Sequence, residues 1–346
     1  MRVLMTGGCG FIGTAIADLM LRRGNQVLNI DRLTYAANPS ALQGWMGSDR
    51  YRIVKGDICD MAKVLSVFEE FQPDCVIHAA AESSVDRSID GAAQFLQTNF
   101  VGTYTMLEAA RHWWAKRKGT YRFHHVSTDE VFGSLGPGDP GVREQTSYAP
   151  NSPYAASKAA SDHLVRAWGQ TYGLPVVTTH STNSYGPWQF PEKLVPLMIT
   201  KGAEGEALPL YGAGDNVRDW LHVADHAEAV RVVLEHGNTG ETYNVGGSFE
   251  QPNVEIVRMI CNELDEHMPE NAPHERMICH VEDRVAHDWR YAVDTTKIWS
   301  DLRWRPEIEF RRGLSRTVDW YLQNRPWWQE IRRKRYRGER LGRQAA

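Results

Sequence analysis

Two carboxylates stand side by side at the end of an apolar stretch, in the segment HHVSTDEVFG over residues 124–133. Asp129 and Glu130 directly follow Ser127 and Thr128. Neighbouring carboxylates repel, and a chain tolerates this where one group stays protonated and the other charged, as in an acid–base pair. The segment alone favours a solvated acidic turn after a strand, so the case for an acid–base pair depends on the rest of the chain.

A tyrosine and a lysine four residues apart form a second candidate, in SPYAASKAASDHL. On a helix, Tyr154 and Lys158 share one face. An ammonium group lowers the pKa of a neighbouring phenol, so the pair suits proton abstraction from a substrate hydroxyl while hydride leaves its carbon. This spacing is common by chance and gains weight only from its context.

The N-terminal segment VLMTGGCGFIGTAIADLML has the glycine spacing of a dinucleotide-binding loop, with Gly7, Gly10 and Gly13. It follows an apolar run and opens a helical pattern, where backbone N–H groups would face a pyrophosphate. Asp31 ends the next apolar run, where a carboxylate binds the adenosine ribose and disfavours a 2′-phosphate. We expect NAD, although the neighbouring Arg32 leaves NADP open.

The elements that position these residues alternate along the first half of the chain, which predicts βαβ units and a parallel sheet. Apolar runs predict strands at 2–5, 26–30, 51–55, 74–79, 122–127 and 175–179, and periodicity predicts helices at 14–23, 98–118 and 154–172. We predict an α/β fold, a Rossmann-type doubly wound parallel sheet with a smaller mixed α/β substrate-binding lobe. The first domain spans residues 1–180, with later segments crossing back, and the second spans mainly 181–346.

Composition excludes several classes of protein. The 346 residues are 42% apolar and 24% charged with a net charge of −4, so we expect neither a nucleic-acid nor a membrane partner. The basic segment IRRKRYRGER is interpreted as a solvated tail or helix face. Five widely spaced cysteines without a C-x-x-C pair predict no metal site and a reducing compartment. Without a signal peptide or an apolar run of membrane length, we expect a cytoplasmic protein.

Taken together, the motifs make the chain resemble the extended short-chain dehydrogenases/reductases, and among them the dTDP-glucose 4,6-dehydratases. The resemblance runs from residue 1 to about residue 340 and rests on TGGCGFIG, DRLTYAAN, AAESSVDRSI, TNFVGTY, FHHVSTDEVFG, SPYAASKAASDHLVRAW, NSYGPWQFPEKL, GDNVRDWLHVADH, ETYNVGG and YRGERLG. The TDE triplet is the specific mark of the dehydratases, because epimerases and decarboxylases of this family do not normally have the Asp–Glu pair.

The resemblance implies a redox-neutral cycle that converts dTDP-glucose to its 4-keto-6-deoxy derivative and water, with NAD as cofactor. Tyr154, helped by Lys158, would take the proton of the C4 hydroxyl as hydride passes to NAD. Glu130 would then remove the C5 proton, and a protonated Asp129 would donate to the departing C6 hydroxyl before hydride returns to C6. Thr128 would hydrogen-bond the C4 oxygen.

The resemblance also implies binding residues and a partner. Together with the glycines, Tyr154 and Lys158, the family's cofactor contacts correspond to Phe11, Ile12, Asp31, Leu33, Thr34, Asp57, Ile58, Ala79, Ala81 and Thr98. Its substrate contacts correspond to Ser83, Thr128, Asn183, Lys193, Leu194, Pro209, Tyr211, Arg218, Asn253 and His287. Asp57 as a helix cap, Asn183 as a turn residue and His287 as a packing residue remain alternatives. A homodimer is implied through a four-helix bundle of the helix after Asn99 and the Tyr154 helix, although their apolar residues equally fit the core.

Several positions depart from the family's pattern, namely Ser84, His180, Ser184, Trp188, Gln189 and Val285–Ala286. We expect them in the walls of the sugar and nucleotide sites, where they leave the reaction type but put the substrate in question. A UDP-linked sugar, another elimination position, a 4-epimerase and a non-catalytic NAD-binding regulator are the alternatives. The Asp129–Glu130 pair argues against the epimerase, and a regulator has no chemical need for both this pair and the Tyr154–Lys158 pair.

Overall fold

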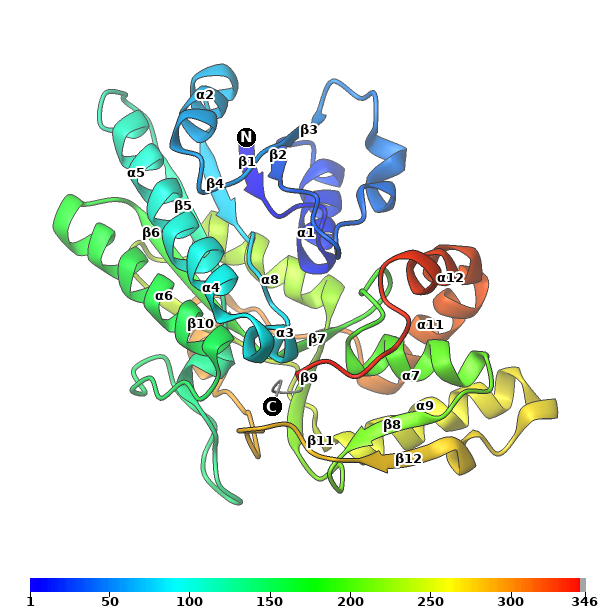
Figure 1. The fold of residues 1–346 in the computed structure, drawn as a ribbon. Helices are drawn as coiled ribbons and strands as arrows, with labels where there is room; N and C mark the ends of the chain where they lie inside the picture. Colours follow the sequence, from blue (N-terminus) through cyan, green and yellow to red (C-terminus); the bar gives the residue numbers. More distant parts are fainter. Residues whose placement is uncertain (343–346) are drawn as a thin grey trace.

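Seven parallel strands form the larger sheet, in the order β10-β6-β5-β4-β1-β2-β3 (Figure 1). The computed structural model describes residues 1–342. The strands are β1 (Arg2–Thr6), β2 (Gln26–Asp31), β3 (Tyr51–Lys55), β4 (Cys75–His78), β5 (Arg122–Thr128), β6 (Val176–Ser181) and β10 (Thr242–Val245). The six predicted strands and the Rossmann-type order are confirmed, and the seventh strand crosses back from the second half of the chain.

Helices cover both faces of this sheet. On one face lie α2 (Met61–Phe71), α5 (Gly102–Trp114) and α6 (Pro153–Tyr172), and on the other α1 (Phe11–Arg22) and α8 (Val223–His236) (Figure 1). Successive strand residues point to opposite faces, so each strand serves two cores. Leu4, Leu28 and Val76 are buried in the core with the side chains of α2 and α5, and Val3, Val27 and Ile77 in the core with those of α1 and α8.

Local sequence sets the limits of the helix that bears the Tyr–Lys pair. The Ser152 hydroxyl accepts from the N–H of Ala155 at 3.0 Å, and Gly173 ends α6 with φ +67°. The helix predicted at 98–118 differs, because Leu96–Val101 forms a π-helical turn before α5 begins at Gly102. Asn99 in this turn donates to Ser157 of α6 at 2.8 Å, which joins the two helices.

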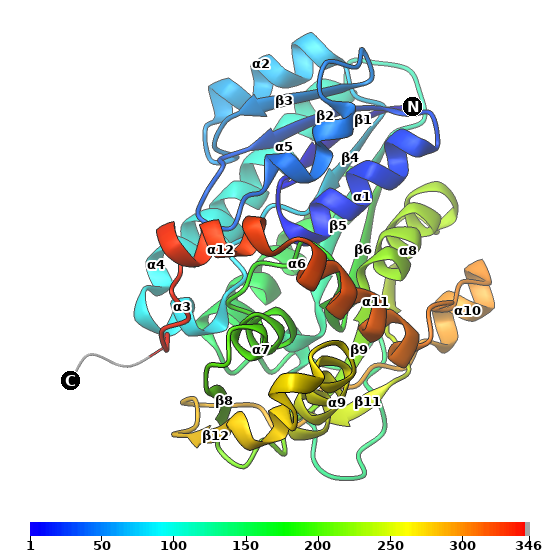
Figure 2. The ribbon, with the colours of Figure 1, turned by 90° about the vertical axis from the view of Figure 1, so that its right-hand side faces the viewer.

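The second half of the chain builds a smaller part below the carboxyl ends of the strands (Figure 2). Its strands are β7 (Asn183–Tyr185), β8 (Leu208–Tyr211), β9 (Val217–His222), β11 (Glu250–Pro252) and β12 (Ile278–Val281). Its helices are α7 (Leu194–Ala203), α9 (Asn253–His267), α11 (Phe310–Gln323) and α12 (Arg325–Lys334). The helix α10 (Thr296–Leu302) packs instead on β10 and α8 of the larger part. Large aromatic side chains, including Tyr185, Tyr321 and Trp328, fill the core of the smaller part.

Short elements complete the chain. Between β4 and the π-helical turn lie α3 (Val85–Asp90) and α4 (Ala92–Phe95), and 3₁₀ turns occur at Pro39–Trp45, Asp129–Phe132, Pro269–Asn271 and His274–Met277. After α12 the chain runs down to α3, where the N–H of Gly342 donates to Asp90 at 3.0 Å (Figures 1 and 2). Over residues 1–342, no helix is both long and apolar enough to cross a membrane.

Candidate active site

The glycine loop joins β1 to α1 in a turn that larger residues cannot form. Gly7 has φ +70°, and a Cβ atom on Gly13 would lie 2.1 Å from the Gly7 carbonyl oxygen. Gly10, at the N-cap of α1, has no side chain to accept from the first N–H groups of the helix. These groups border a cavity of about 300 Å³, so the loop fits the pyrophosphate of a dinucleotide.

Asp31 is fixed at the end of β2 by two backbone hydrogen bonds. Its carboxylate accepts from the N–H of Cys9 at 2.9 Å and of Leu33 at 2.8 Å. Arg32 pairs with Asp57 at 3.5 Å, so its charge already has a carboxylate partner. Asp60, not Asp57, caps α2, which removes helix capping as the alternative for Asp57.

The first cavity gathers most of the predicted cofactor residues. Its lining includes Gly7, Gly10, Phe11, Ile12, Gly13, Asp31, Thr34, Asp57, Ile58, Ala79, Ala81, Thr98, Tyr154 and Lys158. Leu33 is outside this lining and acts through its N–H on Asp31. Ser83 and Thr128, predicted as substrate contacts, also border this cavity.

The adjacent carboxylates occupy the 3₁₀ turn after β5. Asp129 is 3% exposed, and its Oδ2 atom has no hydrogen-bond partner within residues 1–342. Burial, followed by the charges of Glu130 and Asp219, raises the pKa of Asp129 well above its usual range. Burial also raises the pKa of Glu130, but Lys193, Arg218 and Arg284 oppose this rise. Asp129 is therefore suited to be the acid and Glu130 the base.

Tyr154 and Lys158 share one buried face of α6, as predicted. The Lys158 ammonium donates to the Val126 carbonyl at 2.9 Å, and burial lowers the pKa of Lys158 to about 8. Burial and then the charge of Glu130 raise the pKa of Tyr154, although a hydrogen bond with Thr128 opposes this. The expected lowering of the Tyr154 pKa is thus outweighed in this structure by loss of hydration.

A second cavity of about 360 Å³ adjoins the first, and Glu130, Asn183 and Lys193 border both. It contains the other predicted substrate residues, Leu194, Pro209, Tyr211, Arg218, Asn253 and His287. The Arg218 guanidinium donates to the carbonyls of Val217, Asp288 and Trp289 and lies over the Tyr291 ring. These contacts fix the orientation of Arg218 and leave two of its five N–H groups for a ligand.

Sequence reasoning missed two arginines of the second cavity. Arg284 pairs with Asp86 through two contacts of 2.7 and 2.8 Å, and Arg340 lies over the Tyr211 ring. Both lie in motifs that the sequence shows, DRVAHDW and YRGERLG. The solvated-tail interpretation of residues 331–340 is therefore wrong for Tyr336 and for residues 338–340, which line the cavity. The helix-face interpretation holds for Arg333 and Lys334, which are exposed at the end of α12.

The positions that depart from the family's pattern fall into two groups. Ser84 and Ala286 line the second cavity, and Ser184 and Gln189 line the first, as predicted. His180, Trp188 and Val285 line neither cavity. His180 is buried against Asp162, Trp188 packs against Trp320 and Trp327, and Val285 is 56% exposed.

The parallel sheet, the glycine loop and the Tyr154–Lys158 pair define a dinucleotide-dependent enzyme of the short-chain dehydrogenase/reductase class. The family model described as GDP-mannose 4,6 dehydratase matches residues 4–317. The dTDP-glucose 4,6-dehydratase of Escherichia coli is 48% identical, over 99% of this chain and 99% of its own length. The chain therefore belongs to the family of sugar-nucleotide 4,6-dehydratases that includes the dTDP-glucose enzymes.

Two further relatives agree in sequence and in structure. The dTDP-glucose 4,6-dehydratase of Xanthomonas campestris is 52% identical, over 98% of each chain. The crystal structure of the dTDP-glucose 4,6-dehydratase of Bacillus anthracis, in complex with NAD, has a TM-score of 0.86. It is 40% identical, and the match covers 96% of this chain and 99% of that one.

Proposed function

We propose that this protein is an NAD-dependent hydro-lyase that converts dTDP-glucose to dTDP-4-keto-6-deoxyglucose and water. The observation that carries this proposal is the position of Glu130 in both cavities, beside a buried Asp129 whose pKa burial raises. An elimination needs a base at C5 and an acid at the C6 hydroxyl on one sugar, and two adjacent carboxyls supply both.

The residues of the chain divide the work between two steps. Tyr154 takes the proton from the C4 hydroxyl, and Lys158 and Thr128 hold the phenol and the C4 oxygen in place. The C4 ketone acidifies the C5 proton, Glu130 removes that proton, and Asp129 gives its proton to the departing C6 hydroxyl. When bound, NAD would supply reversible hydride transfer, from C4 and later to C6, and Glu130 would return its proton to C5.

The electrostatics of the two cavities support the choice of ligands. Lys193 and Arg218 give the second cavity cationic donors for a nucleoside diphosphate, whereas Arg284 and Arg340 pair with Asp86 and Glu282. In the first cavity, Asp31 would repel a 2′-phosphate, and Arg32 is paired with Asp57. We therefore propose NAD over NADP, with residues 1–180 and the crossing strand β10 as the main cofactor domain and 181–346 mainly as the substrate domain.

The test is to incubate the purified protein with dTDP-glucose and, separately, with UDP-glucose, and to follow loss of water by mass spectrometry. Loss from the dTDP sugar without net NADH formation is the expected result. Loss from the UDP sugar alone would show that the departures at Ser84, Ser184, Gln189 and Ala286 changed base specificity. Conversion of neither sugar, with NAD bound, would overturn the proposed substrate.

We further propose a homodimer through the outer face of α5 and α6. Leu96, Phe100 and Tyr104 recur at helical spacing and are 38–52% exposed, and Tyr172 of α6 is 52% exposed. A second copy would bury this stripe in the four-helix bundle that the family resemblance implies. Phe100→Glu should convert the dimer to a monomer in light-scattering chromatography, whereas an unchanged mass would contradict this interface.

We propose the cytoplasm as the compartment. The five cysteines form no disulfide, and burial raises the pKa of the Cys9 and Cys75 thiols to about 12, so these two thiols are unreactive. Immunolocalisation or fractionation of the native host would test this assignment.

A further inference from the structure

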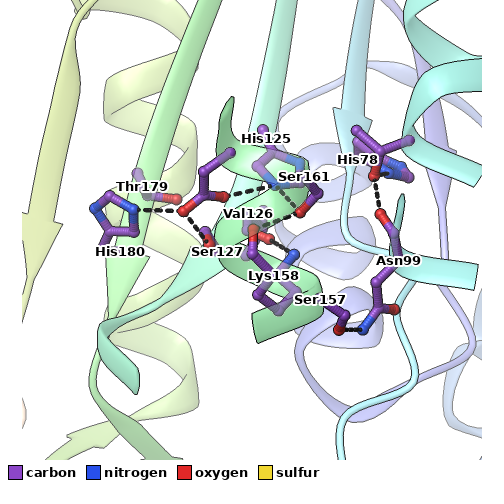
Figure 3. Close-up of polar contacts among 12 residues, drawn as sticks. His78, Asn99, His125, Val126, Ser127, Ser157, Lys158, Ser161, Thr179 and His180 are labelled. Carbon is purple, nitrogen blue, oxygen red and sulfur yellow. Dashed lines mark hydrogen bonds and ion pairs between the residues drawn. The ribbon is translucent and has the colours of Figure 1, made fainter. Parts of the chain in front are cut away.

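A buried polar cluster lies behind Lys158, where α6 packs on β5 and β6 (Figure 3). At its centre is the carboxylate of Asp162, which is 5% exposed and follows Lys158 by one helical turn. Asp162 Oδ2 accepts from the Ser127 hydroxyl at 2.9 Å and the Tyr148 hydroxyl at 3.1 Å, and contacts His180 Nε2 at 2.9 Å. His125 Nε2 lies 3.1 Å from the other oxygen.

The imidazole of His125 does not neutralise this carboxylate by carrying a charge. Burial, and then Lys158, lower the pKa of His125 to about 4, and burial also lowers that of His78, which stacks on His125. The Nδ1 atoms of His125 and His180 have no hydrogen-bond partner within residues 1–342, so a proton there would be buried without an acceptor.

Asp162 itself stays ionised. Although burial by itself would raise the pKa of Asp162, hydrogen bonds from His125 and His180 hold it well below its usual range. Lys158, one helical turn before Asp162 on α6 and equally buried, is a cation that this charge can stabilise. Burial lowers the pKa of Lys158 to about 8, and Asp162 is the charge that opposes this effect.

Other ionisable groups also face this region from each neighbouring element. They are Tyr154 and Asp162 on α6, His78 on β4, His125 on β5, His180 on β6, and Asp129 and Glu130 after β5. The raised pKa of Asp129 favours its neutral form, and the charge of Glu130 is shared by the cations of the second cavity. Asp162 is thus the fixed negative charge of the cluster.

We infer that Asp162 is a positioning residue, whose buried carboxylate keeps Lys158 in the cationic form that assists proton abstraction by Tyr154. The inference deepens the proposed function and rests on it. The Lys158 ammonium has three N–H groups, of which one is held by the Val126 carbonyl. With Asp162 ionised, this ammonium remains charged in a site that would otherwise favour its neutral form.

The test compares the wild-type protein with Asp162→Asn, which keeps the shape of the side chain and removes its charge. Lysine labelled with ¹³C at Cε reports the Lys158 titration by NMR, with Lys158→Arg to assign its signal. The midpoint should fall by at least about one pH unit in the variant, which lowers the cationic fraction at pH 8 by roughly fivefold. An unchanged midpoint would overturn the inference.

The pH profile of activity gives a second readout. The alkaline limb of kcat/KM should move to lower pH together with the NMR midpoint, whereas a merely structural role would lower kcat/KM equally at all pH values. Asp225→Asn is the matched control, because Asp225 is also buried and accepts from the N–H of Ile308, far from Lys158 in the chain. Its alkaline limb should match that of the wild type.

A second variant covers the case in which Asp162→Asn does not fold, and the NMR titration covers the case in which the wild type is inactive. If Asp162→Asn does not fold, Ser127→Ala with Tyr148→Phe removes two donors but leaves the charge, so the Lys158 midpoint should stay at or above the wild-type value. A fall in this double variant would contradict the inference. If the wild type does not dehydrate dTDP-glucose, the proposed function fails, and the NMR titration still decides whether Asp162 controls the charge of Lys158.

Discussion

Asp129 and Asp162 are both buried carboxyl groups near the end of β5, yet their pKa values move in opposite directions. Asp129 accepts a hydrogen bond from the Thr128 hydroxyl at 3.3 Å, and its Oδ2 atom has no hydrogen-bond partner within residues 1–342. Asp162 is surrounded by Ser127, Tyr148 and two histidines. Burial alone does not set the charge of a carboxyl group, because the number of donors decides whether the ionised form is tolerated.

The comparison also separates a carboxyl group that takes part in the reaction from one that acts on its neighbours. A carboxyl group in the lining of a cavity, with surroundings that favour its neutral form, is suited to donate a proton. A carboxylate held by several donors on one oxygen is fixed and stays ionised, so its field acts on neighbouring groups. The chain thus uses one residue type for two tasks.

The largest effect is expected from replacing the base that accompanies Asp129. Glu130→Gln should lower kcat by roughly 10²–10⁴-fold, because the amide cannot accept the C5 proton. Oxidation at C4 should persist in a single turnover, so NADH absorbance should appear. Deuterium exchange at C5 in heavy water measures the lost step, and exchange at the wild-type rate would contradict the role of Glu130.

Asp129→Asn should lower kcat by roughly 10²-fold and still stabilise the fold at neutral pH. The folded-state pKa of Asp129 is raised, so its contribution to stability is fully present below the unfolded-state pKa and is lost as pH rises through the folded-state value. An asparagine side chain does not titrate in this range, so the variant does not lose this stability as pH rises. Thermal melts at pH 7.5 should therefore show a higher midpoint temperature for Asp129→Asn than for the wild type. A lower midpoint would contradict the opposite effects on stability expected for Asp129 and Asp162.

Asp162→Asn should destabilise the protein at neutral pH by about 2–3 kcal/mol, because hydrogen bonds to a charged acceptor are lost. The folded-state pKa of Asp162 is depressed, so its stabilisation is present above the unfolded-state pKa and declines as pH falls toward the folded-state value. Urea unfolding should show the difference from the wild type narrowing below about pH 4. A constant difference across this range would show that charge is not the cause.

The smallest effect is expected from removing one donor. Tyr148→Phe deletes the hydroxyl that lies 3.1 Å from Asp162, and should cost about 1 kcal/mol in urea unfolding. Tyr121→Phe is the matched control, since the Tyr121 hydroxyl donates to the Lys118 carbonyl in an exposed hydrogen bond and its loss should cost close to zero. Equal losses of unfolding free energy in the two variants would show that the Tyr148 hydroxyl does not stabilise the Asp162 carboxylate.

Much of the cofactor side was predictable because its signals are local. Gly7, Gly10 and Gly13 lie in the segment that leads from β1 into α1, and Asp31 follows at the end of the next strand. The glycine spacing and the carboxylate therefore appear in one short stretch of sequence. The Tyr154–Lys158 spacing likewise fixes a shared helix face. The π-helical turn at Leu96–Val101 was missed, because its pattern resembles the start of α5.

The substrate side was less predictable because its residues come from distant segments. Arg284 meets Asp86 across the cavity, and Arg340 reaches the Tyr211 ring from the end of the described chain. The donors of Asp162 come from β5, β6 and the segment before α6. No spacing rule joins such positions, and His180 carried no signal beyond its departure from the family's pattern.

The sequence by itself determined the strands, the glycine loop, the Tyr–Lys face and the adjacency of Asp129 and Glu130, because period, turn geometry and peptide connectivity act over a few residues. Only the tertiary structure decided which carboxyl group is neutral and which is charged. That choice depends on burial and on donors brought together from separate strands and helices, since the free energy of a buried charge is set by its whole surroundings.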